Sequence, residues 1–370
     1  MPFFSYNFLG EFMKKIIVLL LLLIPININA INTSATSSIL MDIDSNRILY
    51  EENIHNIRSV ASISKIMTAV IAIESGKLDD KVIIGNEINK SYGSGIYIKE
   101  GEVLTLRDLL YGLMLRSGND AALAIANYVG GSVNEFVNLM NNKAKELKMN
   151  NTTFNNPSGL DQDKGNYSTA YDMALLTSYA MKLDEYKKIT STKKYTLKTN
   201  KNIYSWINKN KLLSLYKYST GGKTGFTEIA KRTLVTTASK NNVNLVVVTL
   251  NDGNDWQDHQ NLFEYGFNNY TKINILKKGS LNIYDEHYYE DYDLYVKNNF
   301  DYLIGNNEED SIIFKYKLEK LRKIKNDDKI GKVDIYIGDN KIHEEYIYVK
   351  EKIKNKKSVF EQIKEWIIKL

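Results

Sequence analysis

The sequence contains no cysteine and only four histidines among its 370 residues. Without cysteine there are no disulfides, no thiol catalysis and no cysteine-ligated zinc. The histidines, His55, His259, His287 and His343, form no HExxH-type pair, so we expect neither a metalloenzyme nor a cofactor. The net charge of +5 is mild, and lysines alternate with acidic residues, which argues against a nucleic-acid partner. Hydrolytic chemistry in this chain would therefore rest on serine or carboxylate side chains.

The N-terminus has the pattern of an export signal. A Met-Lys-Lys start at residues 13–15 precedes an uninterrupted apolar run over residues 16–24, and the small residue Ala30 follows. This pattern predicts a signal peptide over residues 1–30, with residues 1–12 as an upstream extension. The apolar run is too short to cross a bilayer comfortably, although a buried strand or a membrane anchor remains an alternative. We expect an exported protein that works at the extracytoplasmic face of a bacterial membrane.

The C-terminus has apolar side chains at spacings of three and four, at Val359, Phe360, Ile363, Trp366, Ile367 and Leu370. This spacing predicts an amphipathic helix of about 20 Å, too short to span a membrane. Because a basic run over residues 352–357 precedes it, we interpret residues 351–370 as an anchor on the membrane surface. A helix packed against the preceding domain is the alternative.

Between these ends, helical periodicity gives way to short β-rich runs near residue 272. Residues 31–271 are expected to form a catalytic domain, and residues 272–350 a small β-rich domain in which short strands alternate with Asn, Asp and Gly turns. One stretch, 311–325, could instead be helical. In the first domain, periodicity predicts helices over 62–74, 104–116, 120–129, 133–149 and 169–182, and strand pairs over 38–50 and 233–250.

A serine followed by lysine three residues later occurs at Ser62, Ser191 and Ser214, which is about the number that chance delivers. Only Ser62 opens a strong helical pattern. Lys65 would then lie on the same helix face, one turn away, and could accept the hydroxyl proton. The positive end of the helix dipole would stabilise the developing alkoxide. A simple helix cap is the alternative role for Ser62.

Two further motifs follow downstream. Ser117 and Asn119 occupy a polar break between two apolar helical stretches, where a short loop could present both side chains. Lys223, Thr224 and Gly225 occur together once, before a strand pattern. A lysine charge, a hydroxyl donor and a glycine that permits close backbone approach suit a substrate that bears a carboxylate.

These three motifs, in this order, are the signature of penicillin-binding proteins and class A β-lactamases. The surrounding sequence resembles the D-alanyl-D-alanine carboxypeptidases among the low-molecular-weight penicillin-binding proteins, over segments 61–69, 109–121, 156–160, 167–170, 208–213 and 222–227. The resemblance implies an α/β (α+β) transpeptidase domain with an antiparallel sheet and helices on both faces. It also implies a small C-terminal all-β domain and a terminal amphipathic helix.

The resemblance also implies a role for each motif residue. Ser62 would attack the bond between the two terminal D-alanines of a peptidoglycan pentapeptide, with Lys65 as the general base. Ser117 and Lys223 would relay the proton to the leaving group. Asn119 would contact the substrate amide, Thr224 would contact the substrate carboxylate, and Gly225 would let the substrate backbone approach closely. The backbone N–H groups of Ser62 and Phe226 would form the oxyanion hole. β-Lactams would acylate Ser62 covalently as inhibitors, and the reaction would serve cell-wall maturation.

Two positions depart from the family pattern. Many members have histidine where this chain has Asn166. The arginine that contacts the substrate carboxylate in some members has no clear counterpart near Asp258, although Arg232 is a candidate. The carboxylate contact beyond Thr224 therefore stays open at this point.

Three alternatives remain. A class A-like β-lactamase would need a glutamate for deacylation, and Glu146 superficially fits, although carboxypeptidase-like sequence follows it directly. A catalytically silent wall-binding protein on the same scaffold is the second alternative. Endopeptidase action on wall crosslinks is the third.

Overall fold

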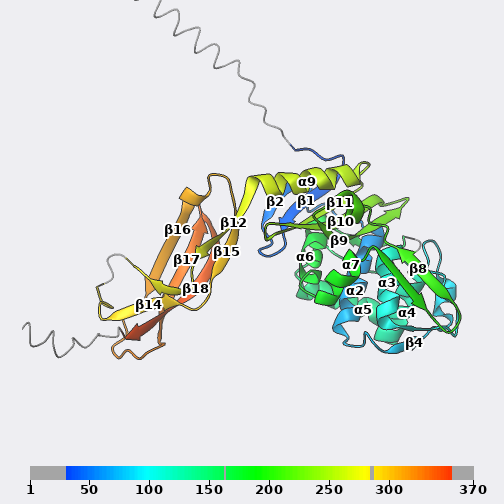
Figure 1. Cartoon of the computed structure of the whole chain (residues 1–370), viewed down its shortest axis with the longest axis horizontal. Helices are drawn as coiled ribbons and strands as arrows, with labels where there is room; N and C mark the ends of the chain where they lie inside the picture. The colour runs from blue at the N-terminus through cyan, green and yellow to red at the C-terminus, as the bar shows by residue number, and fades with distance from the viewer. Residues whose placement is uncertain (1–30, 162–163, 284–286, 352–370) are drawn as a thin grey trace, which may run out of the picture. The chain divides into compact units, whose positions relative to one another are not determined.

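The computed structural model describes residues 31–161, 164–283 and 287–351 (Figure 1). The predicted signal peptide, and the predicted anchor beyond residue 351, lie outside the described residues. Within the part of the chain that is described, no helix combines the length and the apolar character needed to cross a membrane.

The catalytic part is built on a five-stranded antiparallel sheet in the order β2-β1-β11-β10-β9. Its strands are β1 (Ser37–Asp42), β2 (Ile48–Glu52), β9 (Ser219–Thr227), β10 (Lys231–Lys240) and β11 (Val243–Leu250). The pairs β1–β2 and β10–β11 correspond to the two strand pairs that the sequence predicts. Strand β9, which carries Lys223, is an edge strand.

Helices cover both faces of this sheet (Figure 1). They are α2 (Lys65–Glu74), α3 (Leu106–Arg116), α4 (Asn119–Gly130), α5 (Val133–Glu146), α6 (Ala170–Ala180), α7 (Asp184–Ser191), α8 (Leu212–Leu215) and α9 (Asp255–Asn269). Because side chains alternate along a strand, Ile39 and Met41 join the core with α2 and α6. Leu40 faces α9, where Gly266 permits close packing, since an added Cβ would lie 3.0 Å from Leu40. The expected fold class is confirmed.

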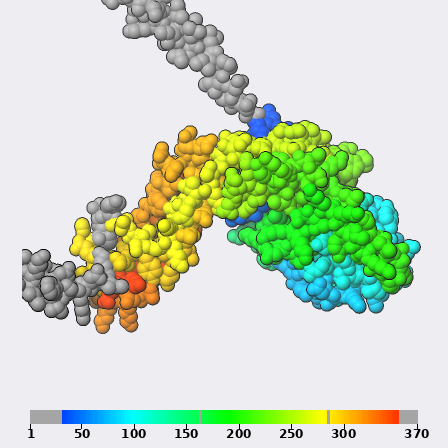
Figure 2. Space-filling model, viewed as in Figure 1, coloured from blue at the N-terminus to red at the C-terminus, as the bar shows by residue number. Residues whose placement is uncertain are grey.

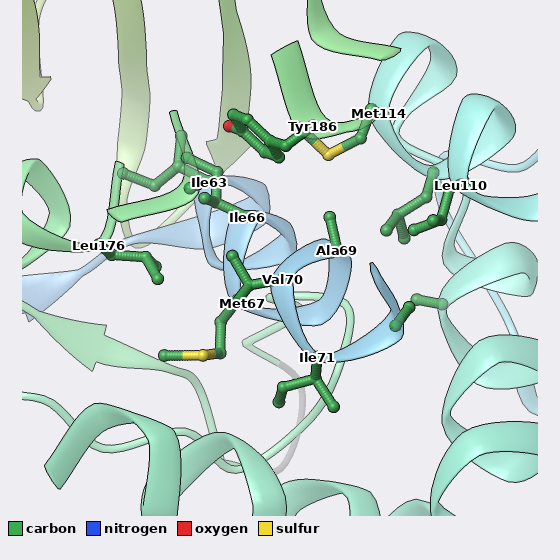
Figure 3. Close-up of a cluster of buried hydrophobic side chains, with 14 of the residues drawn as sticks. Ile63, Ile66, Met67, Ala69, Val70, Ile71, Leu110, Met114, Leu176 and Tyr186 are labelled. Atoms are coloured by element: carbon green, nitrogen blue, oxygen red, sulfur yellow. The ribbon is translucent and has the colours of Figure 1, made fainter. Parts of the chain in front are cut away.

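Helix α2 is the centre of the catalytic core (Figure 3). Its residues Ile66, Met67 and Val70 are fully buried, and the cluster includes Leu110 of α3 and Leu176 of α6. Burial of each large apolar side chain contributes about 1.5–3 kcal/mol. The helix that begins with Lys65 is therefore held rigidly on several sides.

Short elements connect this core. They are the strand pairs β3 (Arg58–Ser59) with β6 (Tyr167–Ser168), β4 (Lys81–Ile83) with β5 (Val103–Thr105), and β7 (Lys194–Lys198) with β8 (Ile203–Ile207), and the 3-10 turns η1 (Ala61–Ser64) and η2 (Asn86–Lys90). Turn η1 matters most for function because it carries Ser62.

After α9, the described residues form β-strands and one 3-10 turn. Their buried apolar side chains form a separate hydrophobic core (Figure 2, yellow to orange). Strand β12 (Tyr270–Leu276) pairs with β15 (Phe300–Gly305). A second sheet, in the order β13-β14-β18-β17-β16, contains β13 (Gly279–Leu281), β14 (Tyr292–Val296), β16 (Ile312–Leu318), β17 (Lys329–Ile337) and β18 (Asn340–Glu351), with η3 (Glu309–Ser311) before β16.

The helical alternative for 311–325 is wrong. Residues Ile312–Leu318 pair with β17 along the whole strand. Their β-branched and aromatic side chains suit a pleated surface that is buried on one face.

Candidate active site

Ser62 lies in the 3-10 turn η1, and α2 itself begins at Lys65, three residues later than the sequence predicts. The Nζ of Lys65 is 3.1 Å from the Oγ of Ser62. The residue before Ser62, Ala61, has a φ of +49°, which is unusual for a residue with a side chain. This backbone turn sets the direction in which Ser62 leaves the strand-to-helix connection.

The amine of Lys65 is completely buried and donates hydrogen bonds to two further acceptors. These are the Oδ1 of Asn119, at 2.7 Å, and the backbone carbonyl of Ser158. Burial, and then the nearby charge of Lys209, lower the pKa of Lys65 to about 7, although Asp120 opposes the shift. A lysine with this pKa has a substantial neutral fraction near pH 7 and can accept a proton.

The Ser158 carbonyl is held by a tightly bonded loop. The Oδ1 of Asn156 accepts from the N–H groups of Ser158, at 3.1 Å, and Gly159, at 2.6 Å. Gly159 has a φ of +81°, and an added Cβ there would lie 2.0 Å from the carbonyl oxygen of Ala61. Only glycine at this position therefore lets the loop approach turn η1, which carries Ser62.

Asn166 fixes the start of the same loop. Its Oδ1 accepts from the N–H groups of Asn155 and Asn156, at 2.8 and 3.1 Å, and its Nδ2 donates to the carbonyl of Asn156 at 2.9 Å. The side chain is fully buried. Asparagine supplies both an acceptor and a donor here, which gives the departure from the family histidine a structural explanation.

The second motif lies at the junction of two helices, as its polar break predicts. Ser117 ends α3 with a φ of +63°, and Asn119 begins α4. Asn119 donates from Nδ2 to the carbonyl of Tyr92 at 2.6 Å. The side chain of Asn119 is therefore fixed between this carbonyl and the Lys65 amine.

The third motif lies on the edge strand β9. Lys223 is buried, and its Nζ donates to the carbonyl of Thr224 at 2.6 Å. Burial, and then the charges of Lys65 and Lys209, lower the pKa of Lys223. An added Cβ at Gly225 would lie 3.0 Å from the backbone nitrogen of Ser62, so β9 runs close to η1 here.

These elements surround a cleft of about 390 Å³. Its lining includes the sequence-predicted residues Ser62, Ser117, Thr224, Gly225 and Phe226. Lys65, Asn119 and Lys223 are all buried, and two of them contact lining residues directly. In the described residues, no cluster of three or more histidine, aspartate or glutamate side chains could hold a metal ion.

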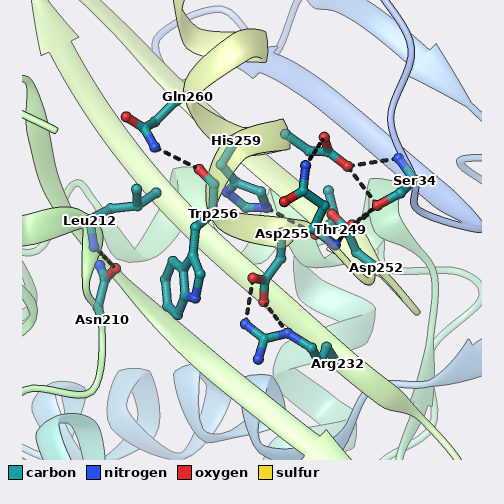
Figure 4. Close-up of polar contacts among 12 residues, drawn as sticks. Ser34, Asn210, Leu212, Arg232, Thr249, Asp252, Asp255, Trp256, His259 and Gln260 are labelled. Carbon is teal, nitrogen blue, oxygen red and sulfur yellow. Dashed lines mark hydrogen bonds and ion pairs between the residues drawn. The ribbon is translucent and has the colours of Figure 1, made fainter. Parts of the chain in front are cut away.

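The sequence did not predict a definite role for two basic residues that line the cleft, Lys209 and Arg232. Lys209 lines the cleft and donates to the Oγ of Ser94 at 3.2 Å. Arg232 lies opposite Phe226 in the β9–β10 register and forms an ion pair with Asp255, with Nε 3.1 Å from Oδ2 (Figure 4). The Arg232 guanidinium carbon is 5.7 Å from the centre of the Trp256 ring. Lys209 belongs to a segment that carries the family resemblance, which is the signal that could have identified it.

Asp258 has a different role. Its Oδ2 accepts from the backbone N–H of Ser34, at 2.7 Å, and from the Ser34 hydroxyl, at 2.9 Å. On the same helix, His259 is buried with its ring nitrogens 2.6 Å from Thr236 Oγ1 and 3.0 Å from Thr249 Oγ1. These contacts fasten α9 to the sheet and to Ser34. Asp258 and His259 therefore do not replace the arginine that contacts the substrate carboxylate in some family members.

Glu146, the residue that a β-lactamase would require, is the last residue of α5. Its carboxylate is mostly exposed and forms an ion pair with Lys143 at 2.8 Å. It is not among the residues that line the cleft.

Family comparisons cover nearly all the described chain. Residues 26–254 match the family described as D-alanyl-D-alanine carboxypeptidase, and residues 270–355 match the C-terminal domain of penicillin-binding protein 5. The D-alanyl-D-alanine carboxypeptidase DacF of Bacillus subtilis is 38% identical over 220 residues, which cover 58% of this chain and 56% of that protein. DacC of Escherichia coli is 34% identical, over 68% of this chain and 65% of that protein.

Longer alignments agree. DacD of Escherichia coli is 31% identical over 331 residues, covering 83% of this chain and 84% of that protein. Among solved structures, penicillin-binding protein 5 of Haemophilus influenzae superposes with a TM-score of 0.73 at 27% identity, over 86% of this chain and 97% of the other. Penicillin-binding protein 6B of Escherichia coli gives 0.69 at 28% identity, over 87% and 98%. With Ser62 in the lining of the cleft and Lys65 buried within hydrogen-bond distance of it, the chain belongs to the D-alanyl-D-alanine carboxypeptidase family of penicillin-binding proteins.

Proposed function

We propose that this protein is a serine-type D-Ala-D-Ala carboxypeptidase that removes the terminal D-alanine from peptidoglycan pentapeptide stems. The observation that carries the proposal is the fully buried amine of Lys65, 3.1 Å from the Ser62 hydroxyl, with a pKa of about 7. A lysine in this state can serve as a general base, which a structural lysine on the surface cannot. Family membership supports the same activity.

In the proposed reaction, Ser62 Oγ attacks the carbonyl between the two D-alanines while its proton passes to Lys65. The oxyanion accepts hydrogen bonds from the backbone N–H groups of Ser62 and Phe226, where loss of one donor costs ~10²–10³ in rate. The carbon–nitrogen bond then breaks, and the leaving D-alanine takes a proton through Ser117 and Lys223. Water hydrolyses the acyl-enzyme ester and regenerates the Ser62 hydroxyl.

Asn119 would contact the substrate amide, because its carboxamide is already fixed beside Lys65. Thr224 would bind the terminal carboxylate of the substrate. We add Arg232 and Lys209 as the cations that attract this carboxylate, since both line the cleft with Thr224. β-Lactams, which also carry a carboxylate, would acylate Ser62 by the same route.

Export and attachment complete the proposal. Residues 1–30 would direct export, residues 31–271 would form the catalytic domain, and residues 272–350 the β-rich domain. Residues 351–370 would bind the surface of the cell membrane on its extracytoplasmic side. The enzyme would then act on the wall beside the membrane. Truncation after Asn355 should release the exported protein from membranes. Unchanged sedimentation of the truncated protein with membrane vesicles would contradict the anchor.

The test of activity uses the mature protein and a pentapeptide that ends in D-Ala-D-Ala. Free D-alanine should appear with the wild-type protein and not with Ser62→Ala. Fluorescent penicillin should label the wild-type protein covalently and leave Ser62→Ala unlabelled. Labelling that persists in Ser62→Ala would refute the nucleophile, and rapid turnover of penicillin would favour a β-lactamase instead.

A further inference from the structure

A cavity of about 790 Å³ lies towards the other end of the edge strand β9 from the catalytic cleft. It reaches β9 at Ser219 and Thr220, whereas the cleft reaches the same strand at Thr224. Since a strand rises about 3.3 Å per residue, Thr220 and Thr224 are about 13 Å apart along β9. The cavity is therefore a separate site from the one that holds Ser62.

Three lysines line this cavity, and one of them already has an acidic partner. Lys187 forms an ion pair with Asp184 at 2.9 Å. Lys182, just after α6, and Lys188, on α7, are both exposed, and among the residues that the structure describes neither forms an ion pair. Two cations at one cavity can therefore contact a bound anion.

The carboxylates around the cavity are already engaged. Asp44, which belongs to the lining, accepts from the Nζ of Lys272 at 2.6 Å. Glu185 on α7 forms an ion pair with Arg107. Asp42 accepts from the backbone N–H, at 2.9 Å, and from the hydroxyl of the serine three residues later. The positive charge of the two lysines is therefore not cancelled by these neighbours.

Hydroxyl groups lie beside the lysines. The Oγ of Ser219 is buried and, within the described ranges of the chain, has no hydrogen-bond partner. Thr220 bonds to Thr237 at 2.7 Å, and Ser239 donates to Asn244 at 2.8 Å. A hydroxyl offers one donor and two acceptor positions, so each of the three keeps capacity for a ligand. Because a buried hydroxyl without a partner is uncommon in folded proteins, Ser219 indicates a polar ligand.

The rest of the wall includes apolar side chains. Ile43, Met181 and Ala238 can pack against the C–H groups of a ring, while the hydroxyl cluster of Ser219 and its neighbours can bond to the ring's own hydroxyls. A cavity of this size lies within the usual range for small-molecule sites, which combine apolar walls with a few polar groups. Apolar groups, hydroxyls and exposed cations together suit a saccharide that bears an acidic group.

We propose that this cavity binds a small acidic saccharide. Its carboxylate or phosphate group contacts Lys182 and Lys188, and its ring contacts Ser219 and the apolar wall. The proposal goes beyond the carboxypeptidase activity and does not depend on it, because none of these contacts involves the reacting groups.

The experiment measures binding to the exported protein by isothermal titration calorimetry. The probes are N-acetylmuramate, which carries a carboxylate, N-acetylglucosamine 1-phosphate, and neutral N-acetylglucosamine. At least one acidic probe should bind about tenfold more tightly than the neutral probe, as expected for charge-assisted contacts. The tighter of the two acidic probes identifies whether the site takes a carboxylate or a phosphate. Equal binding of all three probes, or binding of none, would overturn the proposal.

Variants locate the site. The double variant Lys182→Gln/Lys188→Gln should bind the acidic probe about tenfold more weakly and bind the neutral probe as the wild type does. Lys194→Gln, which changes an exposed lysine on β7, is the matched control and should bind the acidic probe normally. Urea unfolding establishes that each variant is folded.

Arg232→Gln separates this cavity from the cleft, which Arg232 lines. The acidic probe should bind to this variant as tightly as to the wild type. Weaker binding to Arg232→Gln, with normal binding to the double variant, would place the probe in the cleft and overturn the proposal. Release of D-alanine is measured in a separate assay, so its absence would contradict the proposed function and leave this site standing.

Discussion

The two sides of the reaction centre differ sharply in how their polar groups are held. Lys65 and Asn119 are buried, and Asn119, besides accepting from Lys65, donates a second hydrogen bond to the carbonyl of Tyr92. Around Arg232 the side chain is 44% exposed, although its partner Asp255 is only 4% exposed. Both sides carry cations, but only the buried side lowers the pKa of a lysine strongly.

From this difference we expect proton transfer on the buried side and substrate recognition on the exposed side. A buried amine responds strongly to its surroundings because little water screens it, whereas an exposed guanidinium keeps its charge and is screened. Changes on the buried side should therefore alter the chemical step by large factors. Changes on the exposed side should alter substrate affinity by small ones.

The largest effect is expected for Lys65→Ala. Loss of the general base should lower kcat for D-alanine release by about 10³-fold, within the usual range for this kind of catalysis. Acylation by fluorescent penicillin, followed by gel assay, should slow by a similar factor. A loss below tenfold in both assays would assign the base to another group.

The pH dependence should reveal the same buried amine. As the proposed general base, Lys65 would be active when neutral, so kcat/KM should rise with pH up to its pKa of about 7 and level off above it. Below that point the rate should fall about tenfold per pH unit. The profile can be measured from pH 5 to 9 with the pentapeptide substrate, and a flat profile across pH 7 would contradict a buried base.

Asn166→Ala tests the loop behind the base. The change leaves two buried N–H groups and one carbonyl without their partners, which should destabilise the folded protein by about 3 kcal/mol. Urea unfolding of the variant and the wild type measures the difference. Asn166→His, the residue found in many family members, should cost less. Equal stability of Asn166→Ala and wild type would mean that the loop does not depend on this side chain.

The smallest effect is expected for Arg232→Gln. Because the guanidinium is exposed and already paired with Asp255, its loss should raise KM about fivefold and leave kcat nearly unchanged. Increasing the salt concentration should reduce the difference between variant and wild type. A large fall in kcat with unchanged KM would instead place Arg232 in the chemical step.

Much of this site can be predicted from sequence because its residues are tied to local patterns. Ser62 and Lys65 are three residues apart at a helix start, so their proximity follows from helix geometry alone. Ser117 and Asn119 mark a break between two apolar stretches, and the break is where α3 ends and α4 begins. The strand pairs of the sheet follow from alternation in the same way.

What could not be predicted depends on backbone atoms and long-range packing. The carbonyl of Ser158 contacts Lys65 across 93 positions of sequence, and a carbonyl group is the same in every residue. Residues Ala61–Ser64 form the 3-10 turn η1, so α2 begins at Lys65, three residues later than helical periodicity predicts. The helical alternative for 311–325 failed because pairing with β17 decides the conformation of that stretch.

The contact between the Ser158 carbonyl and Lys65 also bears on antibiotic resistance. If a bulky side chain of a β-lactam bound at Ser62 entered the cavity of about 510 Å³ that Asn119 and Ser158 line, it would meet the loop that supplies this carbonyl. A substitution that moves the loop to exclude such a side chain would also move an acceptor of the Lys65 amine, and so would impair the proposed reaction. We therefore expect that resistance at this target would arise more readily at the exposed Arg232 side than at this loop.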